Sequence, residues 1–249
     1  MGIAIIYNKD MASEWLGASK RFSGFRERHI SSEITPDDYI LRFHTPEYFE
    51  RVKNTPFFRP AYESIKCVLK SADEVEEHEV VIVPTVGTGH HAERDRWRGY
   101  SFFNDLAILI ERLKEKGFEK IAVLETDTHH SESYRVCDAR FFCISGENKC
   151  KDVVDMKCRI SRSSEPEKYL SRFKEVVEGI AKANPDVVVW YLGQDLHVRE
   201  YSEGNLDGEA LEEMIKAFLS IPGKKIVLLS SGSREDVFEE VISAFKRHS

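Results

Sequence analysis

Short, uniformly apolar runs alternate along the chain with longer segments in which apolar residues recur every three or four positions. The short runs predict β-strands, and the periodic segments predict amphipathic α-helices. The predicted strands are Ile3–Tyr7, Val80–Pro84, Lys120–Leu124, Arg140–Ile144, Val187–Leu192 and Lys225–Leu229. The predicted helices are Pro46–Val52, Ala61–Ser71, Phe103–Lys116, Pro166–Ala183, Gly208–Ser220 and Glu235–Arg247.

The predicted strands do not alternate between apolar and polar side chains, as Val187–Leu192 illustrates. Strands of this composition are typical of a parallel sheet that helices cover on both faces. The alternation of strands and helices therefore predicts an α/β fold with a mainly parallel sheet. A length of 249 residues suits one such domain, and no repeat or long linker divides the chain. We predict a single domain over residues 1–249.

Charge and hydropathy exclude several classes of partner. The chain carries 36 basic and 43 acidic residues, a net charge of −7, which argues against a direct nucleic-acid binder. No apolar run approaches the roughly 20 residues that span a membrane. The first residues lack the basic region of a signal peptide. We expect a cytoplasmic protein with no membrane partner; its oligomeric state is left open.

Histidines gather directly after the predicted strands. Loops at the carboxyl ends of parallel strands converge on one edge of the sheet, where ligands bind. Five of the nine histidines lie in three of these loops: His90, His91, His129, His130 and His197. The sequence therefore predicts a functional site at that edge.

Asp127 and His129 follow one of the strongest strands. Side chains two positions apart in extended chain point to the same side. A carboxylate and an imidazole suit a divalent metal of the zinc type, and Asp195 after a neighbouring strand is the obvious third ligand. Three protein ligands leave a position open for water or substrate. The alternative is that Asp127 and His129 are loop residues that pair with a nearby strand.

The adjacent His90 and His91 predict acid–base chemistry. Neighbouring histidines on a turn can act as general base and general acid when a carboxylate behind each one fixes its tautomer. Glu125 and Glu132 flank the predicted metal ligands and can serve as these carboxylates.

Three segments in this order resemble motifs of the histone deacetylase superfamily, which includes acetylpolyamine amidohydrolases and acetoin-utilisation proteins. The first comprises Gly89-His90-His91-Ala92, Asp95-Arg96 and Gly99–Asp105. The second is Leu124–His130, and the third comprises Leu192–His197 and Gly204-Asn205-Leu206. Upstream, His44–Tyr48 resembles a further family motif, so the likeness runs from about His44 to Asp236.

The resemblance implies an arginase-like, three-layer αβα fold around a sheet of about eight strands. It implies one catalytic zinc ion, or another divalent metal, held by Asp127, His129 and Asp195. It assigns the general base to His90, the neighbourhood of the leaving amine to His91, and their supporting carboxylates to Glu125 and Glu132. It places Gly99 and Tyr100 at the wall of a narrow substrate channel.

The implied function is zinc-dependent removal of an acetyl or other acyl group from an amine, such as acetyl-lysine or an acetylpolyamine, in a small molecule or a peptide. One motif departs from the family. Ser233 stands where the family has a tyrosine that donates to the oxyanion, and losing such a donor typically costs about 10²–10³ in rate. Other donors can substitute: Ser233 itself, Arg234, Tyr134 or Tyr201. The alternatives are a catalytically weak, metal-binding relative that acts as a binding protein, or a metallohydrolase with a different acyl substrate.

Overall fold

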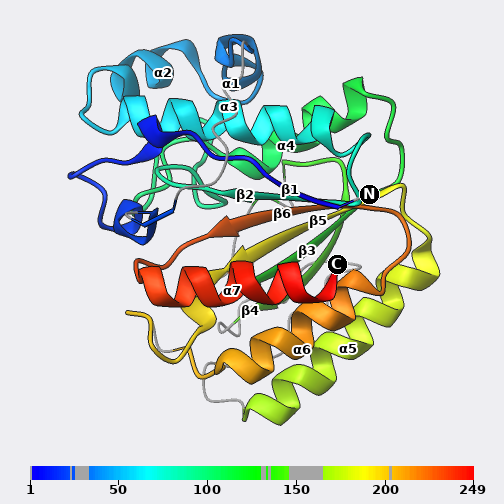
Figure 1. Cartoon of the computed structure of the whole chain (residues 1–249). Coiled ribbons are helices and arrows are strands. Elements are labelled where there is room, and N and C mark those ends of the chain that lie inside the picture. Colours follow the sequence, from blue (N-terminus) through cyan, green and yellow to red (C-terminus); the bar gives the residue numbers. More distant parts are fainter. Residues whose placement is uncertain are drawn as a thin grey trace.

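A computed structural model of the chain describes residues 2–22, 24–25, 34–129, 133, 136–145, 165–201 and 204–249. Within this part of the chain, six strands form one parallel sheet in the order β1-β2-β6-β5-β3-β4 (Figure 1). The strands are β1 (Ile3–Ile5), β2 (Val80–Pro84), β3 (Ile121–Asp127), β4 (Arg140–Ser145), β5 (Val187–Gly193) and β6 (Lys224–Ser230). The α-helices are α1 (Asp37–Phe43), α2 (Pro46–Lys53), α3 (Phe58–Glu74), α4 (Asp105–Glu115), α5 (Pro166–Ala183), α6 (Gly208–Leu219) and α7 (Glu235–His248). Short 3₁₀ helices are η1 (Lys9–Met11), η2 (Gly17–Phe22) and η4 (Gln194–Leu196).

The predicted α/β class with a mainly parallel sheet is confirmed. Each of the six apolar runs forms a strand, and each of the six periodic segments forms a helix. The count of about eight strands is wrong for the described residues, which contain six. That count came from the family resemblance, whereas the apolar runs themselves number six. The short helix α1 was not predicted, because its seven residues span barely two turns of apolar periodicity.

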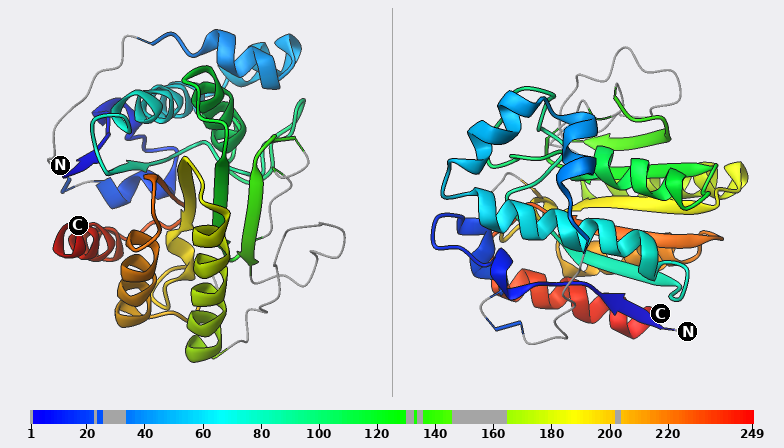
Figure 2. Two further views of the ribbon diagram at one scale, coloured as in Figure 1. Left: turned by 90° about the vertical axis from the view of Figure 1, so that its right-hand side faces the viewer. Right: turned by 90° about the horizontal axis from the view of Figure 1, so that it is seen from above.

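The sheet lies between two layers of helices. Helices α1 to α4 cover one face, and α5, α6 and α7 cover the other (Figures 1 and 2). Every residue of β3 and β5 is buried, which explains why these strands are apolar on both faces. The Trp190 ring of β5 packs between Phe173 of α5 and Phe218 of α6, at centroid distances of 5.5 and 4.7 Å.

Parallel pairing brings the ends of the central strands to the same level. Thr126 of β3 is in register with Leu192 of β5, which is in register with Leu229 of β6. The loops after β2, β3, β5 and β6 therefore start side by side at one edge of the sheet. In the described part of the chain, none of the helices combines the length and the apolar character needed to cross a bilayer.

Candidate active site

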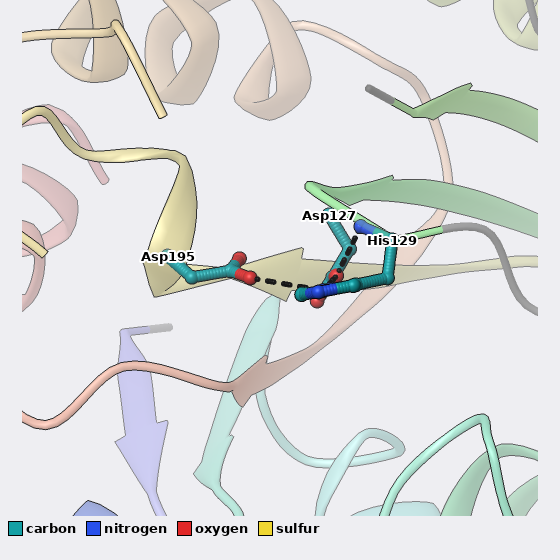
Figure 3. A group of neighbouring side chains, drawn as sticks. All are labelled: Asp127, His129 and Asp195. Carbon is teal, nitrogen blue, oxygen red and sulfur yellow. Dashed lines mark hydrogen bonds and ion pairs between the residues drawn. The ribbon is translucent and has the colours of Figure 1, made fainter. Parts of the chain in front are cut away.

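Three predicted metal ligands meet at the carboxyl edge of the sheet. Asp127 ends β3, His129 follows it, and Asp195 lies in η4 directly after β5 (Figure 3). One potential ligand atom of each residue lies within 4.8 Å of those of the other two. His129 Nδ1 is 3.2 Å from Asp127 Oδ1 and 3.4 Å from Asp195 Oδ2. The third side chain thus comes from the neighbouring strand, as strand-end placement predicted.

Gly193 allows the two carboxylates to approach each other. A Cβ atom at this position would lie 2.5 Å from both Asp127 Oδ2 and Asp195 Oδ1. Real Cβ atoms do not approach other atoms so closely, so the cluster requires glycine here. Neighbouring hydroxyls fix the carboxylates further: Ser231 Oγ donates to Asp127 Oδ2 at 2.9 Å, and Thr128 Oγ1 donates to Asp195 Oδ2 at 2.5 Å.

The electrostatics of this cluster suit a cation. Asp127 and Asp195 are 2% and 0% exposed. Burial and the charge of Asp127 raise the pKa of Asp195, although hydrogen bonds to His129 and Thr128 oppose the rise. Hydrogen bonds to Asp127 and Asp195 raise the pKa of His129 to about 10. Two buried carboxylates and one imidazole are a donor set that fits a zinc-type divalent ion, which would balance their charge.

His90 and His91 lie beside the metal cluster. His90 Nδ1 is 3.1 Å from Glu125 Oε1, which holds the ring from behind as expected. The Nε2 atoms of His90 and His91 face each other at 3.2 Å, and His90 Nε2 lies 4.0 Å from Asp127 Oδ1. Both imidazoles therefore turn one nitrogen toward the same small space. Glu132, the expected partner of His91, lies outside the described residues.

The two imidazoles differ in basicity. Burial lowers the pKa of His90, but the charges of Asp127 and Glu125 outweigh burial and raise it overall. Burial and the charge of His90 lower the pKa of His91 to about 3. Neighbouring groups with pKa values driven apart in this way are typical of acid–base sites.

A pocket of about 460 Å³ opens onto these side chains. His90, His91 and His129 line it, as do the predicted wall residues Gly99 and Tyr100. Ser233 is not among the lining residues. Its amide donates to Glu200 Oε2 at 2.9 Å, so a buried carboxylate holds it in another direction.

Sequence reasoning missed several residues around this pocket. The Tyr191 ring stacks on the His90 ring at a centroid distance of 4.4 Å. Its hydroxyl oxygen accepts a hydrogen bond from the His90 backbone amide at 3.3 Å. The sequence signal for Tyr191 was its polar hydroxyl group within the otherwise apolar run Val187–Leu192. The fully buried Arg21 of η2 donates to four backbone carbonyls: that of Thr85 after β2, those of Leu229 and Ser230 at the end of β6, and that of Ser231 in the loop that follows. No local pattern pointed to Arg21.

Comparison with known proteins identifies the family to which the chain belongs. The histone deacetylase domain family matches residues 10–137, just over half of the chain. The chain therefore belongs to the histone deacetylase superfamily, the class that its fold and site define.

Particular relatives include an acetoin utilization protein and an acetylpolyamine amidohydrolase. AcuC of Staphylococcus aureus is 22% identical over 220 residues, covering 70% of this chain and 57% of the relative. Acetylpolyamine amidohydrolase of Mycoplana ramosa is 50% identical over 42 residues, covering 17% of this chain and 12% of the relative. The chain thus spans little more than half the length of AcuC.

A solved structure supports the fold. The chain resembles an acetylpolyamine aminohydrolase from Burkholderia pseudomallei with a TM-score of 0.82 at 15% sequence identity. The match covers 98% of this chain and 97% of that chain. At this identity the likeness establishes the three-layer arrangement alone.

Proposed function

We propose that the protein is a zinc-dependent amidohydrolase, which removes an acetyl or other acyl group from an amine such as acetyl-lysine or an acetylpolyamine. Its substrate is a small molecule or a peptide in the cytoplasm. The observation that carries the proposal is the convergence of the cluster Asp127, His129 and Asp195 with the His90–His91 pair at one pocket.

The three residues of the cluster and the two histidines have different roles in the proposed reaction. A divalent ion held by Asp127, His129 and Asp195 would polarise the substrate carbonyl and lower the pKa of a water molecule. Once the charge of Asp127 is balanced in this way, one cause of the raised pKa of His90 is removed. His90 Nε2 then accepts a proton from water, while Glu125 fixes the ring with Nδ1 as the donor. His91, which its low pKa leaves neutral at neutral pH, lies beside this nitrogen, where it can take over that proton and pass it to the leaving amine.

A second candidate is a metal-binding relative that binds an acyl-amine and turns it over weakly or not at all. The observation that favours it is the position of Ser233, which replaces the family's tyrosine and faces Glu200. Loss of an oxyanion donor lowers turnover by about 10²–10³ without removing the metal ligands. A third candidate is a metallohydrolase that acts on a different acyl group.

Metal analysis and a substrate panel test the proposal. The purified protein is incubated with zinc, dialysed and assayed on acylated lysine peptides, acetylpolyamines and aryl esters. We expect about one zinc ion per chain and measurable hydrolysis. Asp195→Ala should lose the ion while circular dichroism shows an intact fold, because one of three ligands is removed. His90→Ala should keep the ion and lose most of the turnover.

The outcomes separate the candidates. Zinc retention by Asp195→Ala at parental affinity would contradict the ligand assignment. Loss of zinc from His90→Ala would place His90 among the ligands instead of the acid–base groups. A parent protein that holds zinc and binds acyl-amines but hydrolyses nothing on the panel would favour the binding protein.

A further inference from the structure

Position 233 does not supply a hydrogen-bond donor to the pocket. Glu200 is 7% exposed, and its Oε2 accepts the Ser233 amide at 2.9 Å. Its Oε1 accepts hydrogen bonds from the Arg234 backbone amide at 3.0 Å and from Gln194 Nε2 at 2.7 Å. The Arg234 guanidinium instead pairs with Asp236, Nε to Oδ1, at 2.9 Å. Neither Ser233 nor Arg234 therefore fills the role of the family's tyrosine.

Several other hydroxyls that line the pocket take part in hydrogen bonds of their own. A hydroxyl carries one proton and can donate one hydrogen bond at a time. Ser231 Oγ donates to Asp127 Oδ2 at 2.9 Å, and Thr88 Oγ1 donates to Asp105 Oδ2 at 2.9 Å. Within the same lining, the hydroxyls of Tyr191 and Ser230 share a hydrogen bond of 2.6 Å.

Two exposed tyrosines also line the pocket, and they differ in their surroundings. Tyr100 is 66% exposed, and its ring contacts Phe57 edge-on at 6.4 Å. Tyr201 is 67% exposed and lies on the same post-β5 loop as Asp195. The Gly232 amide hydrogen bonds to the Tyr201 oxygen, which leaves the phenol's own proton available for a further acceptor.

We propose that Tyr201 is a further catalytic residue, which donates a hydrogen bond to the oxyanion that develops on the substrate carbonyl. The phenol keeps its proton throughout and only shares it. This inference rests on the proposed amide hydrolysis and names the donor that the altered motif lacks.

Two further observations support this assignment. Partial burial and the charges of Asp195 and Asp127 raise the pKa of Tyr201 to about 12, so the phenol is protonated at neutral pH. The loop after β6, whose Gly232 amide binds the Tyr201 oxygen, is itself fixed, because Arg21 binds the Leu229 carbonyl at 2.9 Å and also the carbonyl of Ser231. A donor held in place before the reaction is the arrangement that stabilises a transition state most effectively.

Tyr201→Phe tests the donor role, with Tyr39→Phe in α1 as the control. Each exchange removes only a hydroxyl, from a tyrosine that lines the pocket in the first variant and from one outside the pocket in the second. Zinc content, kcat and KM are measured on an acetyl-lysine peptide. Binding of a trifluoromethyl ketone analogue is measured by calorimetry, because its hydrate resembles the tetrahedral intermediate.

Tyr201→Phe should keep zinc and KM near the parental values and lower kcat by about 10²–10³. It should also weaken binding of the ketone analogue about 10-fold or more, since that hydrate accepts the same hydrogen bond. Tyr39→Phe should change kcat by less than about threefold, because the Tyr39 hydroxyl lies outside the pocket and accepts a hydrogen bond from Arg112 Nη1 of α4 at 2.8 Å.

Several results would overturn the assignment. Unchanged kcat and analogue affinity in Tyr201→Phe would exclude Tyr201 as the donor, and an equal loss in Tyr39→Phe would exclude a specific role. Loss of zinc from Tyr201→Phe would show that the residue supports the metal cluster instead. A zinc-loaded parent that neither hydrolyses the panel nor binds the analogue would refute the proposed function, and the Tyr201 assignment with it.

Discussion

Gly193 shows how a missing side chain sets the distance between two charges. Its backbone conformation, φ −75° and ψ 113°, is open to any residue, so torsional freedom does not explain the glycine. The reason is steric: Asp127 Oδ2 and Asp195 Oδ1 occupy the space of a Cβ atom. An added methyl group must push both carboxylates away from the position in which they face His129.

Gly193→Ala should therefore weaken zinc binding by about 10–100-fold, the usual cost of disturbing the support of a metal ligand. Gly179→Ala in α5 is the control, because its Cβ would meet nothing closer than Phe142 at 3.9 Å. That helix position should tolerate alanine or gain up to about 1 kcal/mol in stability. A competition titration with a zinc-binding dye measures the affinities. Parental affinity in Gly193→Ala would refute this account of the cluster.

At the scale of elements, η2 connects the beginning of the chain to the site. Arg21 of η2 is completely buried, and burial lowers its pKa to about 10. Its guanidinium binds the carbonyls of Thr85 after β2 and of Leu229 in β6, and also Gln194 Oε1 at 3.2 Å. The planar fork of arginine satisfies several acceptors at once, which the single ammonium of lysine does not. The two pocket loops are thereby fixed relative to each other.

Replacing Arg21 by methionine should lower the free energy of unfolding by about 3 kcal/mol or more, because several buried carbonyls lose their donor. Arg21→Lys should fall between methionine and the parent. Lys20→Met is the control: Lys20 is the exposed neighbour in the same short helix, and its exchange should change stability by about 0.5 kcal/mol or less. Urea unfolding followed by circular dichroism measures all four proteins. Equal midpoints for Arg21→Met and Lys20→Met would contradict the structural role of Arg21.

At the scale of the whole molecule, buried His44 couples the outer helices to the site. His44 lies between α1 and α2, and its Nε2 accepts the Asn104 amide at 3.1 Å. Asn104 caps α4, and its Nδ2 donates to the Ala92 carbonyl beside the histidine pair at 2.9 Å. This contact requires neutral His44, because a protonated Nε2 has no lone pair left to accept with. Burial lowers the pKa of His44 to about 4.

Global stability should therefore depend on pH through His44. The unfolded histidine titrates near 6.5, so the unfolded state binds a proton first as the pH falls. The stabilisation that depends on neutral His44 is fully present above pH ~6.5. It is lost progressively as the pH falls, and the loss levels off below about 4, the pKa of His44 in the folded protein. The loss amounts to roughly 3 kcal/mol. Urea unfolding of the parent and of His44→Gln is measured between pH 7 and 4. The difference between the two proteins isolates the contribution of His44, because all other groups titrate in both. Parallel pH profiles for the two proteins would contradict the prediction.

The helices, the strands and the neighbourhood of the site follow from local sequence patterns. Apolar runs and helical periodicity are local properties, so each of the six runs, Val187–Leu192 among them, became a strand close to its expected bounds. Because parallel strands end at a common edge of the sheet, the side chains that directly follow them are expected to lie close together. The convergence of Asp127, His129 and Asp195 therefore followed from residue spacing together with the predicted topology.

Which loop side chains face the pocket depends on contacts between distant segments of the chain. The contacts of Ser233 with Glu200, of Arg21 with β6, and of Tyr201 with Gly232 join residues that are 31 to 209 positions apart. They depend on loop torsions such as the φ of +55° at Ser231, which no periodic pattern encodes. A hydroxyl's role depends on which acceptor lies within about 3 Å of it, and packing of distant segments sets that distance. For this reason the sequence located the altered motif, whereas the proposal that Tyr201 takes its place rests on the fold.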